Sequence, residues 1–186
     1  MKKDVERSCL IGGAEKRTIE IVDYDPRWPE QFQAHASTIA LTLGAVALRM
    51  EHIGSTSVPG LAAKPIIDIL VVVENSGDEG YYLPALEAAG YVLRVREPDF
   101  HEHRMLRTPA RDVHIHVFSA GSTEIERYLT FRDRLRCNAV DRQRYETKKR
   151  ALATQSWSDM DAYANAKTEV IEGIIAAARV AGEISQ

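Results

Sequence analysis

The sequence has little cysteine and no hydrophobic run long enough to cross a membrane. Its two cysteines, Cys9 and Cys137, form no C-x-x-C pattern. We expect reduced thiols in a cytoplasmic protein, although spacing alone leaves a disulfide open. The most apolar run, residues 66–73, contains Asp68 and is far shorter than the roughly 20 residues of a transmembrane helix. Residues 1–7 mix basic and acidic side chains, so we expect no signal segment and no membrane partner.

Familiar nucleotide-binding signatures are also missing, since the chain has neither a Walker loop nor a dinucleotide fingerprint. The net charge of −3 is unevenly distributed, because residues 127–150 hold nine Lys or Arg and three Asp or Glu. This basic stretch lacks interleaved stacking aromatics, so we do not expect a nucleic-acid partner. A basic stretch beside an acidic body suits an anionic small molecule such as a triphosphate, or it is a solvated helix face.

The remaining composition is that of a globular domain, with 45% hydrophobic and 27% charged residues among 186. A chain of this length can bury a core without disulfides or metals. We expect residues 1–17 to form a loose tail and residues 18–186 a single domain. Its last third, from about residue 122 to 181, is predicted to be helical.

Periodicity and turn residues predict an α+β fold with a mixed sheet flanked by helices. Strand patterns cover residues 18–22, 46–53, 66–73 and 91–96, and a hairpin is expected from 101–107 and 112–118. Helical patterns cover residues 28–43, 78–89, 123–136, 141–154 and 158–180. Capping boxes are expected at Thr123 with Glu126 and at Ser158 with Asp161.

A polar loop and a buried carboxylate are the first candidates for chemistry. Gly54, Ser55, Thr56 and Ser57 directly follow a predicted strand, and Asp68 interrupts the next apolar strand. Glycine allows close backbone approach to a phosphate, and hydroxyl groups bind phosphate oxygens or a metal-bound water. A carboxylate in an apolar strand is costly unless it is paired, hydrogen-bonded or bound to a cation. The alternatives are that the loop is a simple turn and that Asp68 has only a structural role.

Histidines on the predicted hairpin form a second candidate. His114 and His116 share one strand face, and pairing of Arg107 with Asp112 would place His103 opposite His116 and bring His101 to that face. Imidazoles suit zinc and other transition metals. The predicted metal ligands are therefore Asp68, His114, His116 and His103. The alternative is that these imidazoles only bond neighbouring carboxylates.

Basic side chains near these segments are candidate phosphate contacts. Lys64 precedes the Asp68 strand, and Arg132 and Lys167 lie on later predicted helices. The predicted nucleotide-binding residues are Gly54, Ser55, Thr56, Ser57, Lys64, Arg132 and Lys167. For each cation the alternative is surface solvation.

Longer motifs carry a family resemblance. Gly54-Ser55, followed after twelve residues by Asp68, resembles the DNA polymerase β-like nucleotidyltransferase superfamily. The segments that resemble the GrpB family are residues 24–29, 52–69, 114–117, 129–133 and 162–167, and the match covers residues 19–177. The resemblance implies a nucleotidyltransferase fold with a divalent metal, Mg²⁺ or Mn²⁺. It implies no defined activity, although some relatives are fused to dephospho-CoA kinase.

Leu70 stands where the superfamily carries a second metal-binding carboxylate, so Glu51 or Glu102 would have to replace it. One hypothesis is transfer of a nucleoside monophosphate from an NTP to a small acceptor, with Asp68, His114 and His116 as catalytic residues. An alternative is a non-catalytic module that binds a nucleotide or a coenzyme A precursor through a degenerate metal site. A third is a metal-dependent hydrolase that uses the histidines with Zn²⁺ or another transition metal.

Overall fold

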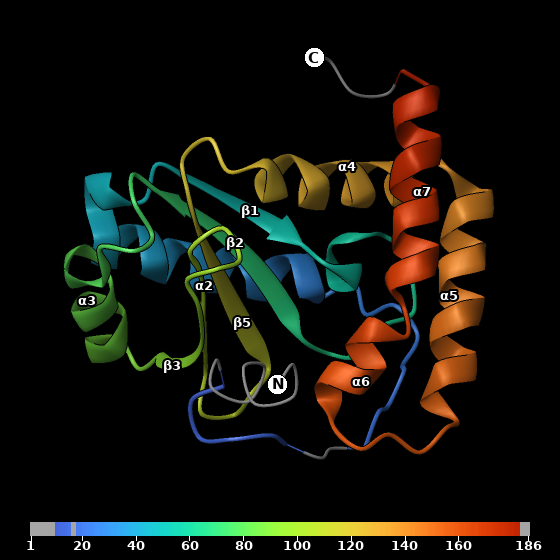
Figure 1. Cartoon of the computed structure of the whole chain (residues 1–186), viewed down its shortest axis with the longest axis horizontal. Coiled ribbons are helices and arrows are strands. Elements are labelled where there is room, and N and C mark those ends of the chain that lie inside the picture. Colours follow the sequence, from blue (N-terminus) through green and yellow to red (C-terminus); the bar gives the residue numbers. More distant parts are fainter. Residues whose placement is uncertain (1–9, 16–17, 183–186) are drawn as a thin grey trace.

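Five strands form one mixed sheet in the order β1-β2-β5-β4-β3 (Figure 1). The computed structural model describes residues 10–15 and 18–182. β2 and β5 pair in parallel, and all other neighbouring strands pair antiparallel. The strands are β1 (Arg49–Ile53), β2 (Ile67–Val73), β3 (Val92–Glu97), β4 (His103–Arg107) and β5 (Val113–Ser119). The predicted α+β class is confirmed.

Helices cover both faces of the sheet because β2 is apolar on both faces. Ile69 and Val71 pack with α2 (Trp28–Leu43) and α3 (Leu83–Ala88). Leu70 and Val72 pack on the opposite face against Ile125 and Leu129 of α4 (Thr123–Cys137). A strand buried on both faces lies in the interior of a sheet, and Asp68 is the second residue of this interior strand.

The last third of the chain packs at one end of the sheet (Figure 1). It contains α5 (Ala139–Ala153), α6 (Met160–Asn165) and α7 (Thr168–Val180). A third apolar cluster joins these helices to the loop after β1, through Val58, Leu61, Tyr145, Val170 and Ile174. The helices therefore close the side of the sheet toward which the Gly54 loop extends.

Several predicted boundaries were wrong. Within the predicted strand 18–22, Val22 alone bridges Ala63, because this segment runs beside a loop and not beside a strand. The predicted strand from residue 46 begins at Arg49, because Gly44–Val46 form a 3₁₀ turn. The predicted helix 78–89 is divided into the 3₁₀ turn Glu79–Tyr81 and α3, which has a proline in its first turn.

The helix starts in the last third also differ from the predictions. Ser122, and not Thr123, precedes α4, and it makes no capping hydrogen bond with its side chain. Asp159 caps α6 by accepting from the Ala162 N–H at 2.8 Å, where a box from Ser158 was predicted. The single helix predicted over 158–180 is broken between α6 and α7, although no proline or glycine marks that point.

Six residues expected in a loose tail are held against the sheet edge. Leu10 bridges Val95, and the Arg94 guanidinium donates to the Ile11 and Gly13 carbonyls. Glu15 accepts two hydrogen bonds from Arg107, at 2.7 and 2.9 Å. The physical reason is that Arg94 is buried and needs acceptors. Cys9 lies outside the described residues, and Cys137 is exposed and donates from Sγ to the Arg134 carbonyl at 3.5 Å. In the described part of the chain, no helix is long and apolar enough to cross a membrane.

Candidate functional site

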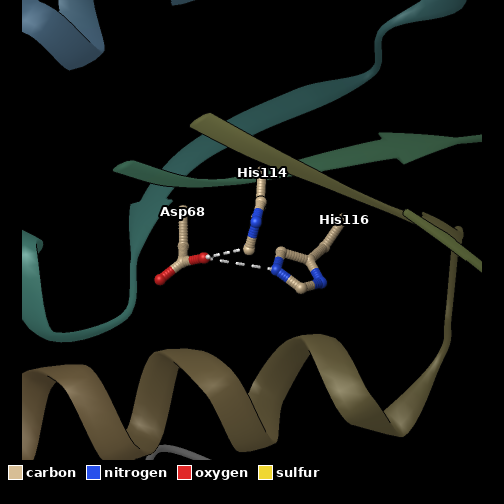
Figure 2. A group of neighbouring side chains, drawn as sticks. All are labelled: Asp68, His114 and His116. Atoms are coloured by element: carbon tan, nitrogen blue, oxygen red, sulfur yellow. Dashed lines mark ion pairs between the residues drawn. The ribbon is translucent and has the colours of Figure 1, made fainter. Parts of the chain in front are cut away.

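Asp68, His114 and His116 converge at the centre of the sheet. Asp68 lies directly beside His114 in the parallel pairing of β2 and β5, and His116 is two residues further along the same face. Figure 2 shows both imidazoles directed at the carboxylate. Oδ1 of Asp68 is 3.5 Å from Nδ1 of His114 and 3.5 Å from Nε2 of His116. The predicted convergence of these three side chains is therefore confirmed.

These three side chains have the geometry of metal ligands. One ligand atom from each residue lies within 4.8 Å of the others. Ligands around a tetrahedral zinc ion are about 3.4 Å apart, given bond lengths of 2.0–2.1 Å, which agrees with the two 3.5 Å contacts. Burial raises the pKa of the Asp68 carboxyl, but the facing imidazoles outweigh this effect and hold that pKa below its ordinary value. Asp68 is thus a charged carboxylate at neutral pH.

Gly54 lets the loop after β1 approach this carboxylate. Its φ angle is +68°, and a Cβ atom at this position would lie 2.3 Å from Oδ2 of Asp68. A side chain would therefore strain the backbone and collide with the carboxylate. Ser55 follows as the first residue of a 3₁₀ turn, Ser55–Ser57. The loop consequently brings backbone and hydroxyl groups close to the Asp68 carboxylate.

A cavity of about 670 Å³ extends from Asp68 to the C-terminal helices and is lined in part by Lys64, Lys149 and Lys167. Lys149 Nζ donates to the Ser55 hydroxyl at 3.0 Å and also to the Ala62 carbonyl. Lys64 Nζ and Lys167 Nζ lie 4.9 and 4.5 Å from the centre of the Tyr163 ring. Three ammonium groups therefore make this end of the cavity attractive to anions.

Burial and mutual repulsion lower the pKa values of two of these lysines. Burial, together with the charge of Lys167, lowers the pKa of Lys149 to about 7. Burial, together with the charge of Lys64, lowers the pKa of Lys167 to about 8, although Asp68 opposes this shift. A polyanion bound among them would favour their charged forms, so ligand binding and protonation are coupled here.

Sequence reasoning missed Lys149 and gave Tyr163 no role in the site. Lys149 is 2% exposed, and it shares a buried face of α5 with Tyr145 and Leu152 at helical spacing. That spacing was the available signal for Lys149. Tyr163 lines the cavity, and its buried hydroxyl has no hydrogen-bond partner among the residues that the structure describes. A buried polar group without a partner is costly, and a ligand that reached this hydroxyl would supply one.

Other predicted nucleotide-binding residues do not line the cavity. Thr56 Oγ1 donates to the Ile66 carbonyl at 3.0 Å, and Ser57 Oγ donates to the Gly54 carbonyl at 2.6 Å. Arg132 donates to Glu51 Oε2 at 2.8 Å and to the His52 carbonyl at 3.1 Å. These contacts stabilise the shape of the Gly54 loop and do not line the cavity.

His103 reaches the site in a different way from the predicted one. Met105, and not His103, lies opposite His116 in the hairpin, a register two residues away from the predicted pairing. The parity is unchanged, so His103 still shares the face and contacts His116, Nε2 to Nδ1, at 3.1 Å. His103 is not among the three converging ligands. His101 is exposed in a turn with φ +52°, so the prediction that it joins this face was wrong.

Neither expected substitute for the second carboxylate joins Asp68, His114 and His116. Glu51 is paired with Arg49 and Arg132, and Glu102 with Arg104. Leu70 is fully buried in the cluster under α4. Within residues 10–15 and 18–182, Asp68 is the one carboxylate in a group able to hold a metal ion.

Two similarities are more distant. A stretch of the dephospho-CoA kinase of Mycolicibacterium paratuberculosis is 29% identical over 175 residues, which cover 80% of this chain and 43% of that protein. The Cid1 poly(U) polymerase bound to MgATP has a TM-score of 0.46 and 13% identity, over 70% of this chain and 45% of that chain.

Closer similarities establish the family. A UPF0157 protein of Halalkalibacterium halodurans is 52% identical over 158 residues, which cover 85% of this chain and 81% of the relative. The crystal structure of the conserved protein GrpB from Enterococcus faecalis has a TM-score of 0.76 and 38% identity, over 86% of this chain and 96% of that chain. The GrpB protein family model matches residues 18–177. The chain therefore belongs to the GrpB family.

Proposed function

We propose that this protein binds a nucleotide or a related polyphosphate together with a divalent metal, in the manner of a nucleotidyltransferase. The observation that carries the proposal is one cavity that joins Asp68, His114 and His116 to Gly54-Ser55 and to three lysines. The metal ligands lie at one end and the cationic side chains at the other. A phosphate chain has the charge to connect them.

The chain's own groups suit the transfer of a nucleoside monophosphate. The oxygen of an acceptor hydroxyl would attack the α-phosphorus and lose its proton to water, and pyrophosphate would leave with the electron pair of the broken P–O bond. Lys64, Lys149 and Lys167 would hold the leaving phosphates, and the Tyr163 hydroxyl would bond one of their oxygens. A bound divalent metal would neutralise developing negative charge on the phosphates. The Ser55 hydroxyl would orient the phosphate chain of the NTP.

A non-catalytic binding module is the second candidate, and Leu70 is the observation that favours it. The position of the superfamily's second carboxylate is apolar and fully buried. A site with one carboxylate gives a metal few oxygen ligands, which Mg²⁺ prefers. The similarity to a dephospho-CoA kinase extends the ligands to be tested to coenzyme A precursors. The comparisons give no support to the hydrolase alternative.

Isothermal titration of metal-stripped protein with a non-hydrolysable NTP tests binding, with Mn²⁺, Mg²⁺ and Co²⁺ in separate titrations. We expect Mn²⁺ or Co²⁺ to strengthen NTP binding in the wild type, and Asp68→Asn to abolish that dependence. Lys167→Met should weaken binding about tenfold or more, whereas Lys148→Met, outside the cavity lining, should leave it unchanged. Equal affinity in the wild type and both cavity variants would contradict the proposal.

Pyrophosphate release separates the two candidates. With a panel of small acceptors, metal-dependent release that is lost in Asp68→Asn would establish transfer. Tight binding without release from any acceptor would instead favour the binding module.

A further inference from the structure

One ring nitrogen of His116 contacts His103, and the other faces Asp68. Its Nδ1 lies 3.1 Å from Nε2 of His103, and its Nε2 lies 3.5 Å from Oδ1 of Asp68. The first distance is that of a hydrogen bond, and the second is at the outer limit of one. The position of the proton shared by the two histidines therefore decides whether the Nε2 atom that faces Asp68 is protonated.

The second ring nitrogen of His103 is held by a carboxylate. Glu97 Oε2 lies 2.6 Å from Nδ1 of His103, and the two residues pair directly across β3 and β4. The His103 side chain is only 8% exposed, and it stacks on Phe118 at 4.7 Å. These contacts fix the ring plane. A continuous chain thus runs from Glu97 through His103 and His116 to Asp68, across β3, β4, β5 and β2.

The chemistry of the first group sets the proton positions along this chain. An ionised carboxylate only accepts hydrogen bonds, so His103 Nδ1 donates to Glu97. A neutral imidazole has one donor and one acceptor nitrogen, so His103 accepts at its other nitrogen, Nε2. His116 must therefore donate from Nδ1, which leaves its Nε2 without a proton.

We infer that Glu97 and His103 are positioning residues that hold His116 as its Nδ1–H tautomer and present a bare Nε2 to a metal ion shared with Asp68 and His114. A metal ion between this nitrogen and the carboxylate oxygen, which are 3.5 Å apart, would bind to both. Two nitrogens and one oxygen favour a transition metal such as Zn²⁺ or Co²⁺ over Mg²⁺. The inference rests on the proposed metal site.

Long-range ¹H–¹⁵N NMR of the histidine side chains tests the tautomer in metal-free protein. We expect His116 of the wild type to be protonated at Nδ1 and bare at Nε2. His103→Phe keeps a ring for stacking on Phe118 but removes both hydrogen bonds, so His116 should lose this preference. His101→Phe, the same substitution at an exposed histidine, should leave the His116 signals unchanged.

Co²⁺ titration followed by visible absorption tests the consequence for the metal. Loss of such an outer hydrogen bond lowers metal affinity about 10- to 100-fold, and we expect this fall in His103→Phe. Glu97→Leu, at a side chain that is 35% exposed, provides a second variant should His103→Phe not fold. It should lower the affinity in the same direction, whereas His101→Phe should match the wild type.

The outcomes separate the inference from the metal proposal. A wild-type His116 protonated at Nε2, or at both nitrogens, overturns the inference. Co²⁺ affinity equal to that of the wild type in both His103→Phe and Glu97→Leu also overturns it. If the expected tautomer is found and lost as predicted, but the wild type binds no Co²⁺, the positioning chain stands and the proposed metal site fails.

Discussion

At the scale of single residues, the site depends on how closely the backbone approaches Asp68. Gly54 combines a positive φ with the 2.3 Å approach that a Cβ atom would make to the carboxylate. Gly60 has a similar φ of +77°, but nothing lies within 4 Å of its Cβ position. The two glycines therefore differ only in the second requirement, and they form a matched pair.

Gly54→Ala should lower the free energy of unfolding by roughly 2–4 kcal/mol, because strain at positive φ adds to the collision with Asp68. Gly60→Ala should cost only about 1 kcal/mol. Urea unfolding measures both, and Co²⁺ titration should show weakened metal binding in Gly54→Ala alone. Equal costs for the two variants would mean that Asp68 moves aside without difficulty.

Leu70→Asp tests whether the second carboxylate can be restored. The residue packs against Ile53, Phe118 and Leu129 and is 0% exposed, so we expect a loss of at least about 3 kcal/mol in unfolding free energy. Leu70→Asn is the uncharged control of the same shape. Unfolding by urea, with and without Mg²⁺, measures the effect. If Mg²⁺ strengthens NTP binding by Leu70→Asp but not by Leu70→Asn, the new carboxylate does reach the metal.

At the scale of elements, the cavity is built where strands meet helices from the far end of the sequence. β2 and β5 supply Asp68, His114 and His116, whereas α5 supplies Lys149 and the junction of α6 with α7 supplies Tyr163 and Lys167. The break between α6 and α7 shapes the cavity, since Tyr163 and Lys167 both line it. α5 also carries a buried amino group, that of Lys149.

Lys149 should make stability depend on pH. Its pKa is about 7 in the fold against an ordinary value of 10.5, so between these values the unfolded chain binds a proton that the folded chain does not. Stability therefore rises with pH in this window, by up to about 1.4 kcal/mol per pH unit. Urea unfolding at pH 7 and pH 9 should show this rise in the wild type, with Lys167 contributing in the same direction.

Lys149→Met should flatten that dependence, because the titrating group is gone. Lys148→Met, at a neighbouring lysine outside the cavity, should keep the wild-type slope. An unchanged slope in Lys149→Met would mean that Lys149 remains charged in the folded protein throughout this pH range.

At the scale of the whole molecule, the first described residues complete the edge of the sheet. Arg94 is 5% exposed, and its guanidinium is bonded to the Ile11 and Gly13 carbonyls. Glu15 adds a carboxylate to the nearby Arg107 and Arg111. Leu10 and Glu15 also line the cavity. The segment therefore contributes to both stability and the cavity wall.

Removal of residues 1–15 should lower the free energy of unfolding by about 1–3 kcal/mol, because Arg94 loses its acceptors while it remains buried. Arg94→Met in the shortened chain should recover part of this loss, since the unpaired charge is then removed. Chemical unfolding of the four chains in this double-mutant cycle measures the coupling. Strictly additive effects would show that Arg94 finds other partners.

Local sequence patterns were enough to predict the β2 strand, the α2 helix, the α+β class and the convergence of Asp68 with His114 and His116. Those predictions depend on local periodicity and on strand parity, which a two-residue change in hairpin register does not alter. Tertiary structure alone decided that Leu70 belongs to the core under α4, that Thr56, Ser57 and Arg132 turn away from the cavity, and that Lys149 and Tyr163 enter it. Each of these outcomes depends on contacts between segments far apart in the sequence, and no local pattern specifies which distant group will satisfy a hydroxyl, an ammonium or a guanidinium.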